Sequence, residues 1–206
     1  PPFVASVPVI CVGNFTAGGA GKTPLVIDFA RALYSADQKP HLLTRGFGGS
    51  LRGPVLVDRQ SHVASEVGDE PLLLAATAPT WVSHNRAQGA RQATKNGASI
   101  IIMDDGFQNP TIVKTLSIIA VDGGYGFGNG KVIPAGPLRE SVNEGLRRCD
   151  AVIIIGDDRH NVEKFIGSKC PIYRAKIVPS PKSSNTEKKV VAFAGISRPS
   201  KFYETL

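Results

Sequence analysis

A glycine-rich turn near the N-terminus carries the side chains best suited to phosphate chemistry. The segment reads VPVICVGNFTAGGAGKTPLVIDFARAL, in which an apolar stretch leads through the turn into a helical pattern. Lys22 is placed to reach the β- and γ-phosphates of a nucleotide, and the Thr23 hydroxyl is placed to hold Mg²⁺. Backbone N–H groups can close around a phosphate where glycine leaves room for its oxygens. The residues expected to do so are Gly18, Gly19, Ala20 and Gly21.

One position departs from the strict P-loop pattern. Thr16 stands where that pattern has glycine, and Ala17 follows it. A plain glycine-rich turn between a strand and a helix is the alternative interpretation. The combination of strand, GGxGKT and helix favours phosphate binding, because each part has its own role in holding a nucleotide. We therefore predict that residues 16–23 bind a nucleoside triphosphate.

Two carboxylates, Asp104 and Asp105, directly follow the apolar run Ser99–Met103. In P-loop proteins a buried strand delivers an aspartate to the Mg²⁺ at the rim of the sheet. An Asp-Asp-Gly turn that merely ends a strand is the alternative. Given the glycine-rich turn, we favour the metal role and predict that both carboxylates lie near Mg²⁺.

A second acidic group lies in the short segment Glu66-Val-Gly-Asp-Glu-Pro71, just before a helical pattern. Pro71 suits the first position of a helix, so Asp69 or Glu70 could cap that helix and complement its dipole. The other interpretation is a general base that accepts the proton of an acceptor hydroxyl during phosphoryl transfer. From these residues alone, capping is the better-supported interpretation.

Two arginines stand beside glycine or proline at expected strand or loop ends. They are Arg45, in Thr44-Arg45-Gly46, and Arg139, in Pro137-Leu138-Arg139-Glu140. An arginine in such a position can clamp a phosphate through two hydrogen bonds. Each could equally form a surface salt bridge, so neither motif decides the question alone.

Short apolar, β-branched runs alternate with helical patterns along the chain. The expected strands are Val7–Val12, His41–Thr44, Val55–Val57, Thr80–Ser83, Ser99–Met103, Leu116–Val121, Ala151–Ile155 and Val190–Ala194. The expected helices are Pro24–Tyr34, Glu70–Ala76, Arg86–Asn96 and Val142–Arg148. This alternation predicts an α/β fold, a P-loop NTPase-like, mostly parallel sheet with helices on both faces. Ligands of such sheets lie outside the carboxyl ends of the strands, where all of the motifs above fall.

Two stretches break the alternation. Gly123–Glu140 is too glycine-rich for regular structure, and we expect a long, mobile loop with a functional role. Pro179–Lys189 is polar with two prolines, which indicates a linker or an exposed hairpin tip. We place a domain boundary near Ala175–Pro181. It separates a nucleotide-binding core at 1–175 from a linker and the start of a smaller, truncated second domain at 176–206.

Composition narrows the classes of partner. A net charge of +7 and a pI near 9.5 favour anionic partners, but no Lys/Arg block of the nucleic-acid type is present. No apolar run reaches the ~18 residues of a membrane span, and no signal peptide is visible.

The three scattered cysteines suit a reducing cytoplasm, and Cys11 is expected to be buried. Because the chain lacks an initiator methionine and stops in a helical pattern, we expect a fragment of a longer protein.

Several motifs occur together in an order that resembles one known family. They are GNFTAGGAGKTP, TRGFGG, EVGDEPLLLA, DDGFQN, GFGNGKVIPAGPLRE, CDAVII and AFAGISRPSKF. In this order the chain closely resembles the tetraacyldisaccharide 4'-kinase family of lipid A biosynthesis over nearly its whole length. Thr16, unusual for a generic P-loop, is ordinary in that family.

The resemblance implies ATP-dependent phosphorylation of the 4'-hydroxyl of a tetraacylated glucosamine disaccharide 1-phosphate, giving lipid IVA. It also implies Mg²⁺ and peripheral attachment to the cytoplasmic face of the bacterial inner membrane. By the same resemblance, Asp104 and Asp105 form the acidic pair near the metal, and Asp69 becomes the candidate base in place of a cap. Arg45, Arg139 and Glu140 match positions that line the same cleft.

The chain also departs from the family pattern. Asn109 stands where the family often has histidine after DDGFQ, so any role of that imidazole is absent. The resemblance further leads us to expect that an N-terminal membrane-facing helix and most of a C-terminal domain, with a histidine that supports the base, are missing. We therefore expect a complete ATP site and an incomplete acceptor site.

Other P-loop classes compete with the kinase. A regulatory GTPase needs a guanine-reading NKxD motif and a DxxG switch, and Asp104-Asp105-Gly106 has the wrong spacing for the latter. A scaffold or partitioning ATPase of the deviant P-loop kind would carry lysine at Ala17. A nucleic-acid motor would explain the basic charge, but no platform for stacking bases is evident.

Overall fold

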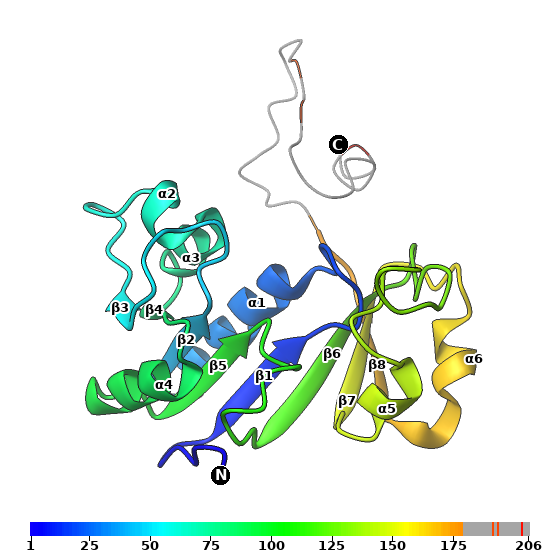
Figure 1. Cartoon of the computed structure of the whole chain (residues 1–206), viewed down its shortest axis with the longest axis horizontal. Coiled ribbons are helices and arrows are strands. Elements are labelled where there is room, and N and C mark those ends of the chain that lie inside the picture. The colour runs from blue at the N-terminus through cyan, green and yellow to red at the C-terminus, as the bar shows by residue number, and fades with distance from the viewer. Residues whose placement is uncertain (179–190, 192, 194–202, 204–206) are drawn as a thin grey trace.

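A single sheet of eight strands organises the part of the chain that the structure describes (Figure 1). The computed structural model describes residues 1–178 together with residues 191, 193 and 203. The strand order is β3-β4-β2-β5-β1-β6-β7-β8, and only β3 runs antiparallel, against β4. The strands are β1 (Val9–Gly13), β2 (Pro40–Thr44), β3 (Val55–Leu56), β4 (Thr80–Val82), β5 (Ile100–Asp104), β6 (Leu116–Asp122), β7 (Ala151–Ile155) and β8 (Ile172–Ala175). The predicted α/β, mostly parallel sheet is confirmed.

Helices cover both faces of the sheet because successive side chains of each buried strand point into two different cores. In β1, Val9 and Cys11 belong to one core and Val12 to the other. The helices on the Val12 face are α1 (Lys22–Ser35) and α3 (Asp69–Leu74). Those on the Val9 face are α4 (Arg86–Lys95), α5 (Val142–Leu146) and α6 (Val162–Ile166). Two short helices, α2 (Ala64–Val67) and η1 (Gly167–Lys169), complete the set among the described residues.

The expected elements within the described residues are present, with small shifts at their ends. The elements that the sequence did not predict are α2, α6, η1 and β8, none longer than five residues. Elements so short carry too few residues for a periodic pattern. The expected strand Val190–Ala194 and the linker Pro179–Lys189 fall outside the described residues, apart from residues 191 and 193.

The carboxyl ends of the parallel strands form one rim, toward the top of Figure 1. The glycine-rich turn follows β1, Arg45 follows β2, and Asp104 ends β5. The topology therefore brings these motifs to the same edge of the sheet, as expected. Of the helices that the structure describes, none has the length and apolar character needed to cross a membrane.

Candidate functional site

The glycine-rich turn connects β1 to α1, and the chain itself holds the turn in shape. Asn14 Nδ2 donates hydrogen bonds to the carbonyl oxygens of Thr16 at 2.6 Å and of Gly18 at 3.1 Å. Gly18 (φ 109°) and Gly21 (φ 82°) adopt left-handed backbone angles, which other residues reach only with strain. Lys22 follows as the first residue of α1. The turn thus has a defined shape at the positive end of a helix dipole, a favourable place for an anion.

The end of the glycine-rich segment Gly123–Glu140 lies against this turn. Thr16 and Leu138 form an antiparallel β-bridge, and the N–H of Arg139 donates to the carbonyl oxygen of Phe15 at 2.7 Å. The segment is irregular, as predicted. Backbone hydrogen bonds hold the segment near Leu138, and its mobility stays a prediction. This pairing carries Arg139 into the site.

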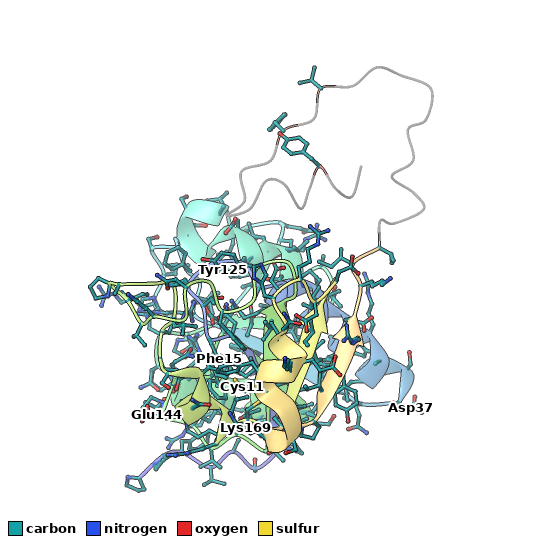
Figure 2. All side chains as sticks on the ribbon, turned by 90° about the vertical axis from the view of Figure 1, so that its right-hand side faces the viewer. Cys11, Phe15, Asp37, Tyr125, Glu144 and Lys169 are labelled. Atoms are coloured by element: carbon teal, nitrogen blue, oxygen red, sulfur yellow. The ribbon has the colours of Figure 1, made fainter. Side chains whose placement is uncertain are left out.

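Packed aromatic rings support the glycine-rich turn. The ring centroid of Phe15 lies 5.7 Å from that of Phe107 and 6.1 Å from that of Phe127. A Cβ on Gly145 would lie 2.2 Å from the Phe15 ring, so α5 can approach only because residue 145 is glycine. Phe15 and Cys11 both lie inside the molecule (Figure 2), and burial raises the pKa of Cys11 to about 12. The predicted burial of Cys11 is confirmed.

Asp104 is the buried carboxylate of the site. It is paired with Val12 of β1 in the strand register, and only 1% of its surface is exposed. Its Oδ1 atom has no hydrogen-bond partner. Burial raises the pKa of Asp104 to about 7; the nearby Glu70 carboxylate adds to the rise, and Lys22 opposes it. A buried carboxylate oxygen without a partner, beside a phosphate-binding turn, fits a ligand of a divalent cation.

The donor set suits Mg²⁺ that is shared with a phosphate ligand. No three His, Cys, Asp or Glu side chains of the described residues gather into a metal cluster. Mg²⁺ is commonly bound through one or two carboxylates, with water and substrate phosphates completing its shell. Asp104 and the hydroxyl of Thr23, in the first turn of α1, are oxygen donors of this kind. These residues therefore fit the predicted ion.

Asp105 is held by two cations. Arg139 donates from Nη1 to Oδ1 at 2.7 Å and from Nη2 to Oδ2 at 3.0 Å, and Lys22 Nζ lies 3.7 Å from Oδ1. Burial acts to raise the pKa of Asp105, but Lys22 and Arg139 outweigh it and hold the pKa below its ordinary value. Asp105 is therefore an ionised anchor for both cations. Its contact with a metal stays a prediction.

Hydrogen bonds of Gln108 connect the start of the glycine-rich turn to Glu140, the residue after Arg139. Gln108 Nε2 donates to the carbonyl oxygen of Asn14 and to Glu140 Oε1, both at 3.0 Å. Glu140 also forms an ion pair with Arg148. Glu140, a candidate substrate residue, thus lies beside the glycine-rich turn, with its carboxylate engaged by protein groups. Gln108 was not predicted as a site residue, although it belongs to the DDGFQN motif.

The Asn109 side chain stabilises the turn in which it lies. Its Oδ1 atom accepts hydrogen bonds from the N–H of Thr111 at 2.9 Å and from the Thr111 hydroxyl at 2.7 Å. Lys114 Nζ donates to the carbonyl oxygens of Phe107 at 2.9 Å and Asn109 at 2.7 Å. The loop that carries Asp105 is therefore stabilised locally, and the amide of Asn109 has a structural task.

Asp69 and Glu70 occupy the first turn of α3, which begins at Asp69. The expectation that Pro71 starts this helix is wrong, and neither carboxylate caps it through a side-chain hydrogen bond. Both can still complement the helix dipole. Partial burial raises the pKa of Glu70; Lys22 opposes this rise, and Asp69 and Asp105 add to it. This acidic pair therefore belongs to the same electrostatic environment as the glycine-rich turn.

Arg86 is a member of the site that the sequence did not predict. It starts α4, is 3% exposed, and donates from Nη1 to the carbonyl oxygen of Ser83 at 2.5 Å, while Nε has no partner. Burial lowers the pKa of Arg86 to about 10; Arg45 adds to this effect, and Asp104 and Asp105 oppose it. The charges of Arg45, Asp104 and Asp105 therefore all act on Arg86. The available signal was a basic residue just after a strand, at the same rim as the other motifs.

The structure brings most of the predicted site residues together. Lys22, Asp105 and Arg139 are joined by direct contacts, and Asp104 lies next to them on β5. Arg45 follows β2 at the same rim, and its charge acts on Arg86. Thr23 belongs to the first turn of α1.

The sheet order, the glycine-rich turn and the buried aspartate of the neighbouring strand define a P-loop NTPase-like α/β protein. At the level of fold alone, it is similar to the signal recognition particle receptor FtsY from Elizabethkingia anophelis. That likeness has a TM-score of 0.50 and 15% identity, over 81% of this chain and 57% of that chain.

Within this class, the chain belongs to the tetraacyldisaccharide-1-P 4'-kinase (LpxK) family, whose model matches residues 1–206. It is 53% identical to the tetraacyldisaccharide 4'-kinase of Rhodospirillum centenum, over 100% of this chain and 61% of that protein. With the enzyme of the same name from Paramagnetospirillum magneticum it shares 54% identity, over 98% of this chain and 62% of that protein.

A solved structure agrees with this assignment. The chain is similar to the "apo" form of LpxK from Aquifex aeolicus, solved in complex with ATP, with a TM-score of 0.72 and 28% identity. The match covers 84% of this chain and 55% of that one. The chain spans about three fifths of the length of the curated relatives it matches, 61% and 62% for the two named above.

Proposed function

We propose that this chain carries the nucleotide-binding half of an ATP-dependent kinase that phosphorylates the 4'-hydroxyl of a tetraacyldisaccharide 1-phosphate. The product would be lipid IVA, an intermediate of lipid A biosynthesis. The observation that carries the proposal is the constellation at the carboxyl rim. A glycine-rich turn, the Lys22–Asp105–Arg139 cluster and the buried, unpartnered Asp104 lie together there, in a chain that matches this kinase family throughout.

ATP and Mg²⁺ are the proposed ligands of this half. Residues 16–23 would surround the triphosphate with backbone N–H groups, and Thr23 and Asp104 would hold the metal, with Asp105 close by. When bound, Mg²⁺ would neutralise charge on the β- and γ-phosphate oxygens. Lys22 would add a positive charge at the transferring phosphoryl group, where negative charge develops.

Positioning is the main task that remains for the protein, because phosphoryl transfer requires little covalent chemistry from an enzyme. Asp69 would accept the proton of the sugar hydroxyl as its oxygen attacks the γ-phosphorus and the bond to the β-phosphate oxygen breaks. Arg139, held by Asp105 through two hydrogen bonds, would present its remaining N–H donors to phosphate oxygens.

An acylated acceptor implies that the enzyme acts at a lipid surface. The proposed location is the cytoplasmic face of the bacterial inner membrane, with peripheral attachment. The net charge of +7 suits an anionic membrane surface and a phosphorylated acceptor. No role in binding nucleic acid is proposed.

The main alternative is a regulatory or scaffold NTPase of the P-loop class. Nucleotide hydrolysis by the chain can be measured with ATP and GTP, each with no addition, with DNA, or with the acylated disaccharide phosphate. The kinase proposal predicts a preference for ATP and stimulation by the lipid alone. A preference for guanine nucleotide, or stimulation by DNA, would overturn it.

A further inference from the structure

Two of the three cysteines lie in contact at the amino ends of neighbouring strands. Cys149 comes two residues before β7 and Cys170 two residues before β8, and their Sγ atoms are 3.5 Å apart. Both are free thiols in this structure. The two residues are 21 positions apart in the chain, so it is the fold that brings them together.

The backbone beside the pair is held in place by the sheet. Val152 N–H donates to the carbonyl oxygen of Pro171 at 2.9 Å, and Asp150 N–H donates to that of Ser117 at 2.9 Å. The Asp150 carboxylate also accepts a hydrogen bond from Ser117 N–H at 2.7 Å. The short distance between the two sulfurs therefore follows from the pairing of β6, β7 and β8.

The thiols make only weak polar contacts. Cys149 Sγ donates to the carbonyl oxygen of Ala151 at 3.0 Å, and Cys170 Sγ lies 3.5 Å from the carbonyl oxygen of Cys149. Because S–H is a poor donor, little is lost when such contacts are given up. No three His, Cys, Asp or Glu side chains of the described residues form a metal site, so the chemistry open to this pair is that of two thiols.

Cys11 provides a comparison within the same chain. It lies in β1, and β6 separates β1 from β7 in the sheet. Two strand spacings amount to about 10 Å, which is too far for a disulfide without movement of the backbone. Cys11 is therefore excluded from the pair.

The two thiols of the pair differ in their access to solvent. Cys149 is half-buried, whereas Cys170 is 4% exposed. Desolvation raises the pKa of both thiols, so little of the reactive thiolate is present at neutral pH and oxidation should be slow. Cys149 is the thiol that an oxidant can reach first, and Cys170 lies behind it in position to close the bond.

We propose that Cys149 and Cys170 form an intramolecular disulfide with glutathione disulfide as the oxidant, and that this bond fastens β8 to β7. The pair is thus a site of reversible covalent modification. The inference does not depend on the proposed kinase function.

The reaction is a pair of thiol–disulfide exchanges. Cys149 loses its proton, and its sulfur attacks one sulfur of glutathione disulfide, whose S–S bond breaks; the released glutathione thiolate takes up a proton. Cys170 then loses its proton and attacks Cys149 Sγ, and the second glutathione leaves and is protonated in the same way. Two protein thiols are oxidised and one glutathione disulfide is reduced. A reducing cytoplasm would keep the pair as thiols, so the bond would form when the glutathione pool is oxidised.

The bond would act on a pair of strands that supports the glycine-rich turn. β8 is the outermost strand on its side of the described sheet (Figure 1). At the carboxyl ends, a Cβ on Gly21 would lie 2.8 Å from Ile155 Cδ1 and 3.9 Å from Ile177 Cδ1, so both isoleucines pack beside the residue that precedes Lys22. The disulfide would form at the opposite, amino ends and would stabilise this support without entering the nucleotide site.

The test uses the protein that carries this chain, expressed from its full reading frame. It is incubated in a glutathione buffer with a large excess of the disulfide over the thiol, free thiols are alkylated before unfolding, and the peptides are analysed by mass spectrometry. We expect a peptide that links Cys149 to Cys170. The melting temperature should rise by about 5 °C, because the bond restricts the unfolded chain. Dithiothreitol should reverse both changes.

Cys149→Ser should abolish the linked peptide and the rise in melting temperature. It is the milder of the two possible variants, because Cys149 is only half-buried and serine can keep the hydrogen bond to Ala151. Cys11→Ala removes the thiol that cannot join the pair, so it is the matched control and should retain both changes.

Two outcomes would overturn the disulfide. One is a glutathione adduct on Cys149 that never proceeds to the linked peptide, and the other is a pair whose thiols are both still alkylated after the oxidising incubation. A linked peptide with no rise in melting temperature would refute the claim that the bond fastens β8. Kinase activity enters none of these measurements, so their failure would leave the proposed function untouched.

Discussion

The two sides of the carboxyl rim differ in how fully their side chains are paired. On the side of the glycine-rich turn, Asn14, Asp105, Gln108 and Arg139 all contact protein groups at 2.6–3.1 Å. On the other side, three arginines that follow β2 and β4, Arg45, Arg52 and Arg86, have no carboxylate partner among the described residues, and Phe47 is 86% exposed. The comparison teaches that protein contacts fix most groups around the glycine-rich turn and leave Asn14 Oδ1 and Asp104 Oδ1 as buried oxygens without a partner among the described residues. On the other side, no carboxylate of the described residues fixes the arginines.

The largest expected effect concerns the nucleotide side. Lys22→Ala removes the positive charge proposed to act on the transferring phosphoryl group, and kcat should fall by about 10²–10³. The fold should persist, because Lys22 contacts Asp105 at 3.7 Å and is no member of the apolar cores. Steady-state kinetics with a melting curve checks this. Near-normal turnover would refute the P-loop assignment.

The next effect concerns the acceptor side. Asp69→Asn keeps the size of the side chain but removes the proposed base, so kcat should fall by about 10² while KM for ATP stays near wild type. Glu70→Gln, its neighbour in the first turn of α3, is the control and should retain much of the activity. A loss of ATP affinity without loss of turnover would instead give Asp69 a metal or structural role.

A smaller effect is expected for the ion pair between Arg139 and Asp105. Arg139→Lys keeps the charge but cannot form the two parallel hydrogen bonds seen at 2.7 and 3.0 Å. We expect kcat/KM for ATP to fall about 10- to 100-fold, in line with the loss of a charged hydrogen-bond pair. If Arg139→Lys is fully active, the paired geometry does not contribute to catalysis.

The smallest effect is one of stability. Burial raises the pKa of Asp104 from 3.8 to about 7 in the folded chain. The folded state therefore holds this proton more tightly than the unfolded state, and the stability it contributes falls as pH rises from about 4 to about 7. Without Mg²⁺ and nucleotide, Asp104→Asn should melt several degrees above wild type at pH 8. At pH 4 the two should melt together.

Mg²⁺ with ATP should reverse this difference at pH 8, because the ion would satisfy the buried carboxylate of wild type and gain nothing from the amide. Melting curves at both pH values, with and without these ligands, make the comparison. A wild type that melts above Asp104→Asn at pH 8 without ligands would show that protein groups already satisfy the carboxylate.

The sequence predicted the nucleotide side well for a physical reason. Each of its main groups follows directly from a strand: the glycine-rich turn follows β1, and Asp104 ends β5. Parallel strands bring their carboxyl ends to one rim, so spacing along the chain was enough to predict that these groups meet. The same reasoning predicted the α/β sheet and the helices on its two faces.

The contacts that hold the glycine-rich turn, and the role of the basic residues after β2 and β4, could not be predicted from the order of the strands. The bridge between Thr16 and Leu138 joins two irregular segments, and no periodic pattern predicts such pairing. Arg86 became notable only once its burial and its unpartnered Nε were known. Pro71 misled the prediction of α3, which begins at Asp69, because proline is tolerated throughout the first turn and not only at its first position.

The most direct test of the account is to identify the product. The protein that carries this chain, expressed from its full reading frame, is incubated with Mg²⁺, ATP labelled in its γ-phosphate, and tetraacyldisaccharide 1-phosphate in detergent micelles, and the lipid is then analysed by mass spectrometry and NMR. The account predicts a lipid with one additional phosphate, labelled and located at the 4'-oxygen, and no such product with Lys22→Ala. ATP hydrolysis without a labelled lipid, or a phosphate at another hydroxyl, would contradict it.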